Sequence, residues 1–179
     1  LVGHADGLGV LGPKGVGALY IRPGLPLPPF IHGGGQEGNY RSGTENLPGI
    51  CGFAAACESA DAQAEIAQMK ALRDYCRERA AEIPGLVLIG KQDAPHIVNL
   101  SLPGLRSQGI INCLQTRGIY VSAGSACSKG HRSHVLEAMH LSPAVIDGSV
   151  RVSFCADNTK EDVDALMNAL REAKMTLKG

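Results

Sequence analysis

One cysteine in a run of small residues is the feature of this sequence whose chemistry is easiest to state. Residues 122–128 (SAGSACS) carry Cys127 out of an expected strand and toward an expected helix over 133–139. Small side chains leave a thiol room to approach a substrate, and Lys129, His131 and Arg132 add positive charge that favours the thiolate. A structural cysteine in a tight turn is the alternative, and the local residues leave both interpretations open.

The other cysteines do not indicate a metal site or a disulfide framework. The chain has 6 cysteines and no CxxC pair, whereas a zinc knuckle needs closely spaced ligands. We therefore expect no metal site. Buried free thiols in a reducing compartment are the expected state, which predicts a cytoplasmic protein.

The pattern of apolar residues and breakers predicts three regions. Residues 1–45 are rich in glycine and proline and contain one expected strand over 15–21. A long helix is expected from about 49 to 83, ended by Pro84 and Gly85. From residue 86 short strands alternate with helices, which predicts a compact α+β domain. Strands are expected over 86–89, 97–102, 119–121 and 150–154, and helices over 107–117, 133–139 and from 158–159 onward.

Alternation within these segments predicts which side chains face the core. Over 97–102 the leucines and Val98 share one face, with Asn99 and Ser101 on the other. Over 150–154 the apolar residues point inward, so Arg151 and Ser153 lie on the reverse face. For the last helix we expect a capping box between Asn158 and Glu161 and a buried stripe of Val163, Leu166, Met167, Leu170 and Leu177.

Charge and hydropathy exclude several classes of function. Lys plus Arg and Asp plus Glu number 17 each, so no basic field favours nucleic acid or an anionic membrane. No apolar run approaches the ~18 residues that a membrane span requires. Residues 7–12 (GLGVLG) fit the dinucleotide-binding fingerprint, but Pro13 and an expected strand follow in place of the required helix.

Several motifs together resemble one known family. They are residues 12–20 (GPKGVGALY), 33–37 (GGGQE), 41–46 (RSGTEN), 122–128 (SAGSACS), 133–136 (SHVL) and 150–153 (VRVS). Their types and order resemble the cysteine desulfurases of nitrogen fixation and iron–sulfur cluster assembly, within the class-V aminotransferases. The resemblance extends from Gly12 to the end of the sequence.

The resemblance implies an α/β fold, that of the fold-type-I transferases dependent on pyridoxal 5'-phosphate (PLP). The chain would be the C-terminal part of such an enzyme. Residues 1–48 would contain the last strand and loops of the large PLP-binding domain, and 49–85 a long connecting helix. Residues 86–179 would form the small C-terminal α+β domain, which carries the cysteine loop.

The resemblance also implies a reaction and roles for four residues. The reaction is the conversion of L-cysteine to L-alanine, with the sulfur transferred to Cys127 as a persulfide. Arg151 corresponds to the arginine that binds the substrate carboxylate. Thr44 and His4 correspond to residues near the cofactor phosphate. The implied partners are a second copy in a homodimer and a sulfur-acceptor protein such as an iron–sulfur scaffold.

One family position differs here. The lysine that holds the cofactor covalently corresponds to Ala5 or to Gly9, depending on which neighbouring motif anchors the comparison. Two alternatives to a cysteine desulfurase therefore stay open. One is a selenocysteine lyase, which the cysteine loop does not distinguish. The other is a catalytically inactive fragment or paralogue that retains only dimerisation or partner binding.

Overall fold

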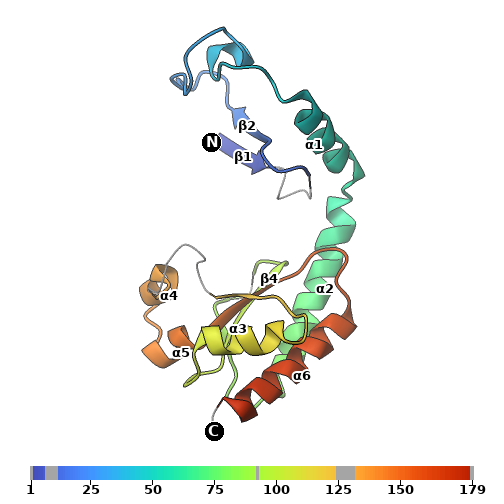
Figure 1. Ribbon diagram of the computed structural model, residues 1–179, viewed down its shortest axis with the longest axis vertical. Helices are drawn as coiled ribbons and strands as arrows, with labels where there is room; N and C mark the ends of the chain where they lie inside the picture. The colour runs from blue at the N-terminus through green and yellow to red at the C-terminus, as the bar shows by residue number, and fades with distance from the viewer. Residues whose placement is uncertain (1, 7–11, 92, 124–131, 178–179) are drawn as a thin grey trace. The chain divides into compact units, whose positions relative to one another are not determined.

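A computed structural model describes residues 2–6, 12–91, 93–123 and 132–177 (Figure 1). The chain divides into two compact units, residues 1–61 and residues 62–179. The boundary lies inside the segment that the sequence assigns to one connecting helix.

The first unit contains a two-stranded antiparallel sheet and one helix. Strand β1 (Val2–Asp6) pairs with β2 (Gly17–Ile21), which places His4 opposite Leu19. The strand expected over 15–21 is confirmed as β2, whereas its partner β1 was not expected. The chain reaches β2 through a turn in which Gly15 has a φ of 85°, so no helix follows the GxGxxG run.

A folded loop leads from β2 to the helix of the first unit. It contains the short 3-10 helix η1 (Glu37–Asn39) and precedes α1 (Leu47–Ser59). The Asn46 side chain accepts a hydrogen bond from the Gly49 backbone N–H (3.2 Å) and so caps α1. Pro48 stands in the first turn of α1, where a missing N–H removes no helical bond.

The single helix expected over 49–83 is wrong, because two helices occupy this segment. Helix α1 ends at Ser59, Ala60 is extended (ψ 117°), and α2 runs over Ala62–Ala81. The Ser59 hydroxyl donates to the Ala56 carbonyl (3.0 Å), which satisfies a carbonyl that a continuing helix would use. Asp61, just before α2, is of a type favoured at helix starts.

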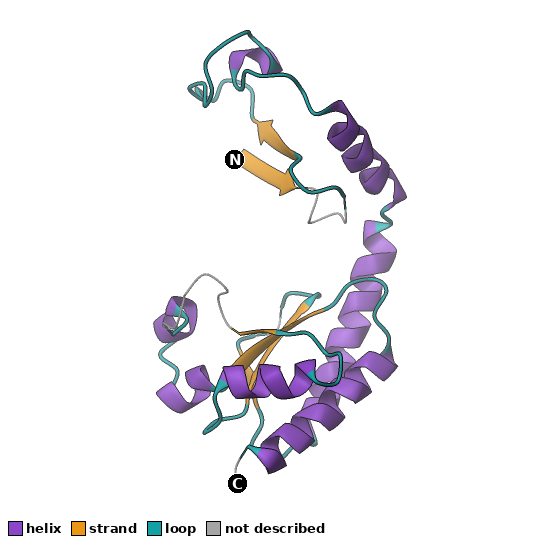
Figure 2. Cartoon of the chain, viewed as in Figure 1, coloured by secondary structure: helices purple, strands orange, loops and turns teal. Residues whose placement is uncertain are grey.

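The second unit is built on a four-stranded antiparallel sheet (Figure 2). Its strands are β3 (Val87–Ile89), β4 (Ile97–Ser101), β5 (Ser122–Ala123) and β6 (Ser149–Ser153), in the order β3-β4-β6-β5. Three of the four expected strands are confirmed within a residue or two. The strand expected over 119–121 is wrong, because β5 begins at Ser122.

The end of helix α3 (Ser107–Gln115) explains the late start of β5. Gly118 has a φ of 72° and its N–H donates to Gln115, while the Ile119 N–H donates to Leu114 (3.1 Å). These bonds form a Schellman motif, which closes a helix with a left-handed glycine. The N–H of Ile119 is thus bonded to the last turn of α3 and is not available for pairing with a neighbouring strand.

Three helices pack on one face of the sheet and enclose the main core. They are α2, α3 and α6 (Lys160–Thr176), and Figure 1 shows α3 and α6 along one side of the strands. The expected core face of the strands is confirmed. Its side chains Val98, Leu100 and Val150 are fully buried, and so are Met167 and Leu170 of α6.

Two details of α6 differ from expectation. Its capping box joins Thr159 and Asp162, not Asn158 and Glu161. The Asn158 side chain instead accepts from the Cys155 backbone N–H (2.9 Å), so the cap falls one residue later. The buried stripe is confirmed except at Leu177, which follows the helix and is 38% exposed.

Helices α4 (His134–Ala138) and α5 (Pro143–Asp147) form a smaller apolar cluster with β3 through Ile89, Leu136 and Ile146. Helix α4 was expected and α5 was not. Two serines on the non-core face of the sheet bind α5. The Ser101 hydroxyl donates to the Val145 carbonyl (2.7 Å) and the Ser149 hydroxyl to the Ile146 carbonyl (2.8 Å). These bonds allow both serines to be buried.

A polar cluster joins α2 to α6. Asp164 accepts hydrogen bonds from the Tyr75 hydroxyl (2.9 Å) and from Arg79 Nε (2.9 Å). Arg79 also pairs with Glu82 (2.5 Å), which in turn accepts from Arg171 (2.9 Å). The Tyr75 hydrogen bond, followed by the one from Arg79, lowers the pKa of Asp164.

Gly148 marks a close backbone approach that only glycine allows. A Cβ atom there would lie 2.3 Å from the Leu102 carbonyl oxygen, which belongs to the backbone and has little freedom to move. We expect Gly148→Ala to destabilise the protein by about 1–3 kcal/mol in urea unfolding. Gly109→Ala in α3 is the matched control, because the nearest atom to its new Cβ lies 3.6 Å away. That variant should be as stable as the parent, or more stable by up to about 1 kcal/mol. Equal stability of the two variants would contradict the close approach.

The Asp164 cluster predicts a pH-dependent stability. A carboxyl whose pKa is lower in the folded state stabilises the protein above its unfolded pKa of about 3.9. That contribution is lost as the pH falls through the lower folded pKa. We therefore expect Asp164→Asn to reduce the melting temperature at pH 7 and to match the parent more closely at lower pH. Asp157→Asn removes an exposed carboxylate and is the control. A difference that stays constant from pH 7 to pH 3 would contradict the assignment.

Candidate functional site

Arg151 lies at the centre of the second unit's sheet. Its strand β6 runs between β4 and β5, and the register places Arg151 opposite Asn99 on one side and opposite Ser122 on the other. Residues directly opposite in an antiparallel ladder share a face, with Cβ atoms about 4.5–5.5 Å apart. Asn99, Arg151 and Ser122 therefore form one polar row across three strands. We call it the Arg151 row.

The next row along β6 belongs to the core. Val150 lies opposite Leu100 and Ala123, and Val150 and Leu100 are fully buried. Because successive residues of a strand point to opposite faces, this register directs Arg151 away from the core. The predicted orientation of Arg151 is thus confirmed by the pairing of the strands.

The guanidinium of Arg151 lacks a protein partner in the described part of the chain. Its Nε is buried and makes no hydrogen bond there, and the side chain forms no ion pair. Arg106 also lacks an ion pair among the residues that the structure describes, but its side chain is exposed to solvent. A buried donor without a partner costs free energy, so such a group in a native protein calls for an explanation. An anionic ligand on this face of the sheet would provide one.

The six remaining arginines of the second unit each contact a carboxylate. They are Arg73 and Arg77 with Asp74, Arg79 with Glu82 and Asp164, Arg117 with Glu172, Arg132 with Asp147, and Arg171 with Glu82. Arg151 therefore differs from its neighbours in being both partly buried and without a counter-ion.

The predicted nucleophile Cys127 lies outside the described residues, as do Lys129 and His131. The strand that leads to it is described, however, and Ser122 of that strand pairs with Arg151. The sequence proposed Cys127 and Arg151 separately. The register adds that the segment bearing the cysteine departs from the strand beside Arg151.

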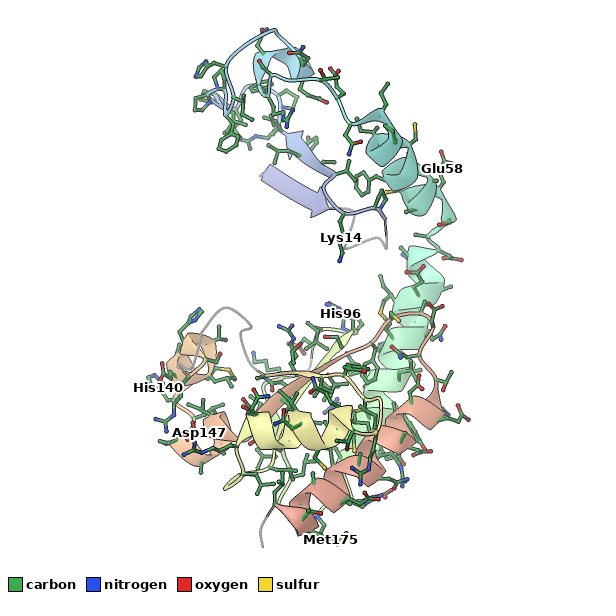
Figure 3. The ribbon with its side chains drawn as sticks, viewed as in Figure 1. Lys14, Glu58, His96, His140, Asp147 and Met175 are labelled. Carbon is green, nitrogen blue, oxygen red and sulfur yellow. The ribbon has the colours of Figure 1, made fainter. Side chains whose placement is uncertain are left out.

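Arg132 follows that segment and was expected to favour a thiolate. Its Nε and one terminal nitrogen instead donate to the two carboxylate oxygens of Asp147 (2.6 and 2.8 Å), at the end of α5 (Figure 3). The hydrogen bond from Arg132 lowers the pKa of Asp147. Because Asp147 balances this positive charge, the expected contribution of Arg132 to thiolate formation is reduced.

Thr44 and His4, the predicted cofactor-binding residues, belong to the first unit. Thr44 is exposed and lies between the loop and α1. The loop folds back on itself, since the Phe30 N–H donates to Tyr40 (2.9 Å) and the Ser42 N–H donates to Ile31 (3.0 Å). Nothing is described for the His4 side chain, although its backbone lies in β1. The structure thus describes these candidates in one unit and Arg151 in the other.

Five cysteines are described, and all five are free. The expectation that the thiols are buried holds only for Cys76, because Cys51 and Cys57 are exposed and Cys113 and Cys155 are partly exposed. Burial raises the pKa of Cys76 to about 12, so this thiol is not a nucleophile near neutral pH. Burial of a thiol depends on packing, which cysteine spacing does not reveal.

Asn99 and Ser122 are neighbours of Arg151 that sequence reasoning did not assign. Alternation placed Asn99 on the polar face, but a single strand does not show which residue lies opposite. Only the pairing of β4, β6 and β5 brings both to Arg151.

The described residues contain neither a metal-binding cluster nor a membrane-spanning helix. No group of three or more His, Cys, Asp or Glu side chains there is arranged to hold a metal ion. Among the helices described, none combines the length and the apolar character needed to cross a membrane.

Comparisons with known proteins agree with the motifs. The family model for aminotransferase class-V matches residues 8–166. Cysteine desulfurase IscS of Methanosarcina thermophila is 40% identical over 173 residues, which are 93% of this chain and 43% of that protein. Cysteine desulfurase IscS of Dictyoglomus turgidum is 41% identical over 166 residues, 89% of this chain and 42% of that protein. The chain thus spans less than half the length of these curated relatives.

Solved structures share the fold. A NifS-like protein superposes with a TM-score of 0.84 at 36% identity, over 96% of this chain and 45% of that one. The NifS-like protein of Rickettsia africae gives a TM-score of 0.84 at 26% identity, over 96% of this chain and 47% of that one. The expected α/β fold of type I is therefore confirmed. The chain belongs to the aminotransferase class-V family, with cysteine desulfurases among its relatives.

Proposed function

We propose that this chain is part of a PLP-dependent cysteine desulfurase, in which Arg151 binds the substrate carboxylate and Cys127 accepts the sulfur. The observation that carries the proposal is the buried Nε of Arg151, which lacks a partner within the described residues and lies in the strand next to β5. The 40% identity to a cysteine desulfurase supports the same reaction.

An α-carboxylate suits the Arg151 row. A guanidinium binds a carboxylate through two parallel hydrogen bonds, which orient the ligand as well as hold it. Asn99 and Ser122 flank Arg151 with neutral polar groups and add no competing charge. An amino acid bound by its carboxylate there has its side chain directed in a defined way, which a sulfur-transfer reaction needs.

Cys127 follows Ala123, the last residue of β5, by four positions. In the sequence, Cys127 therefore follows closely on the strand that pairs with Arg151. In the proposed reaction the thiolate of Cys127 forms an S–S bond to the substrate sulfur as the carbon–sulfur bond breaks. The electron pair stays with the substrate carbon, which takes up a proton and becomes the methyl group of L-alanine. Because the persulfide needs a reduced thiol at the start, the reaction fits the cytoplasm.

PLP would supply the electron withdrawal that makes this carbon–sulfur bond breakable. The residues of this chain fit the group only in part. Thr44 offers an exposed hydroxyl for a phosphate, but the family's lysine position corresponds to Ala5 or Gly9. Lys14 is the one lysine between residues 1 and 61, and it stands in the exposed turn before β2. The chain therefore does not fit covalent attachment of PLP, and the proposed roles of Arg151 and Cys127 involve no bond to the cofactor.

A second candidate function follows from the absence of a lysine at the family's lysine position. A protein without the lysine would keep dimerisation or the binding of a sulfur acceptor, such as an iron–sulfur scaffold, and would lack turnover. The observation that favours it is the residue at the lysine position, Ala5 or Gly9. A homodimer is expected under both functions, so oligomeric state does not separate them, whereas turnover does.

The test uses the native protein that contains this chain, incubated with PLP, L-cysteine and a reductant. We expect alanine and sulfide in equal amounts, and a persulfide on Cys127 in peptide mass spectra taken without reductant. Cys127→Ala should abolish the persulfide and reduce sulfide release to background, while L-alanine still binds. No turnover in the parent protein would instead favour the second function. A persulfide on another residue would contradict the role of Cys127. Competition between L-cysteine and L-selenocysteine decides whether the protein is a selenocysteine lyase.

Arg151→Lys tests the carboxylate site, because lysine keeps the charge and loses the bidentate fork. We expect KM for L-cysteine to rise about 10- to 100-fold, since a hydrogen bond to a charged group contributes about 1.5–3 kcal/mol. Arg106→Lys is the matched control, an exposed arginine of the same unit without an ion pair in the described chain. An unchanged KM in Arg151→Lys would remove Arg151 from the site.

A further inference from the structure

The side of β6 that faces β5 is only partly paired. Strand β5 pairs with β6 only as far as Arg151. The Phe154 N–H donates to the His96 carbonyl (2.8 Å) on the β4 side. The backbone groups of Ser153 therefore point to the opposite side, because successive residues of a strand alternate in the direction of their hydrogen bonds. Among the described residues none forms a backbone hydrogen bond with Ser153 on that side.

The Schellman motif at the end of α3 explains this unpaired edge. It bonds the Ile119 N–H to Leu114 (3.1 Å), so the chain leaves the helix without pairing with β6 over residues 118–121. Tyr120 would lie opposite Ser153 if the register of β5 and β6 continued, but Tyr120 is 79% exposed. The segment and the strand therefore diverge, and the space between them lies beside the first turns of α6.

This space is a pocket of about 210 Å³, which we call the Ser153 groove. Its apolar lining includes Ile119, Val121, Phe154, Val163 and Leu166, and its polar lining includes Asn158 and Asp162. Pockets that bind drug-sized molecules are usually about 300–1,000 Å³, so this one suits a single side chain better than a whole ligand. The unpaired peptide groups of Ser153 suit the backbone to which such a side chain belongs.

The charge beside the groove is mainly acidic. Asp162 lines it, and a hydrogen bond from the Thr159 backbone lowers the pKa of this carboxyl, so Asp162 is ionised at neutral pH. Glu161 is exposed next to it. The neighbouring cation, Lys160, lies with its Nζ 5.2 Å from the centre of the Tyr75 ring. A lysine or arginine of a bound molecule would therefore be attracted to this end of the groove.

We propose that the Ser153 groove binds an extended peptide segment of a partner protein. The segment pairs with β6 at Ser153 as a short strand, which is recognition by β-strand addition. It places one apolar side chain in the pocket and a lysine or arginine beside Asp162. The backbone hydrogen bonds supply affinity, while the pocket and its acidic rim supply selectivity. No residue of the Arg151 row takes part, so this interaction is separate from the proposed catalytic function.

Peptide binding to the native protein that contains this chain tests the proposal. The probes are acetylated, amidated pentapeptides with valine, leucine or phenylalanine at the centre, threonine on both sides and lysine at both ends. We expect at least one to bind with a Kd below about 1 mM in isothermal titration calorimetry. Its counterpart with glutamate ends should bind about 2- to 10-fold more weakly, and high salt should reduce the difference. If no lysine-ended peptide binds, the proposal is overturned. That result includes the case in which another part of the native protein already fills the groove.

Ala165→Leu tests the location of the site. Ala165 is an exposed residue of α6 that lines the groove, so a leucine there takes up its space. Leucine is a good helix former, and we expect the variant to fold and to bind the tightest peptide at least 10-fold more weakly. Ala81→Leu is the matched control, because Ala81 is an exposed alanine of α2 outside the groove, and it should bind as the parent does. Equal binding by the parent and Ala165→Leu would exclude the groove as the site.

Hydrogen exchange of the parent protein provides a second measurement that needs no variant. The Ser153 amide should exchange at least 10-fold more slowly with the peptide bound, because its N–H then donates to the peptide backbone. The amide of Gly104, in an exposed turn of the same unit, should exchange at an unchanged rate. Unchanged exchange at Ser153, or equal slowing at Gly104, would contradict strand addition at β6.

Discussion

The position of β6 between β4 and β5 is the constraint on which the candidate site depends. Strand alternation sends Val150 and Val152 into the core, where both are buried, and so leaves Arg151 on the opposite face. A shift of the strand register by one residue would bury the guanidinium in the apolar core. Burying this charge without a partner would cost far more free energy than leaving it on the opposite face. The hydrophobic core therefore holds Arg151 in place, although no core residue touches the proposed chemistry.

One part of the sheet face that carries Arg151 binds α5, and another part carries the Arg151 row. At one end α5 accepts hydrogen bonds from Ser101 and Ser149 and packs Ile146 against Ile89. One row further along the strands, the polar groups are those of the Arg151 row. Helix α5 also holds Asp147, which binds Arg132 just after the segment that bears Cys127. The same short helix thus completes the small apolar cluster and binds Arg132, which follows the proposed nucleophile in the sequence.

The two units differ in how much of their surface they bury. The second unit encloses a continuous core from three helices and a sheet. Within residues 12–61 only Ser42 and Gly49 are buried, while large side chains such as Phe30 (87% exposed) and Leu47 (65% exposed) are open. Burial of apolar surface is the main favourable term in folding, so the second unit accounts for most of the stability of this chain. The first unit retains its local order through caps and turns.

The sequence by itself determined the local features of this protein and the family to which it belongs. Alternation over 97–102 and 150–154 predicted which side chains face the core, because one buried face demands it. The motif order predicted the class-V aminotransferase family, which the comparisons confirmed. Patterns of this kind extend over only a few residues, so they can be recognised in a single sequence.

Only the tertiary structure decided the features that depend on contacts between distant residues. The pairing of Asn99 and Ser122 with Arg151 requires the strand order, and α5 becomes evident through the serines that bind it. The helix break at Ala60 and the shift of β5 to Ser122 arise from backbone hydrogen bonds whose acceptors a residue pattern does not specify. Arg132 appeared to be a free cation in the sequence because its partner, Asp147, lies 15 residues away and is brought to it by folding. Charge balance in a site is therefore a property of the fold, since it depends on which side chains folding brings within hydrogen-bonding distance.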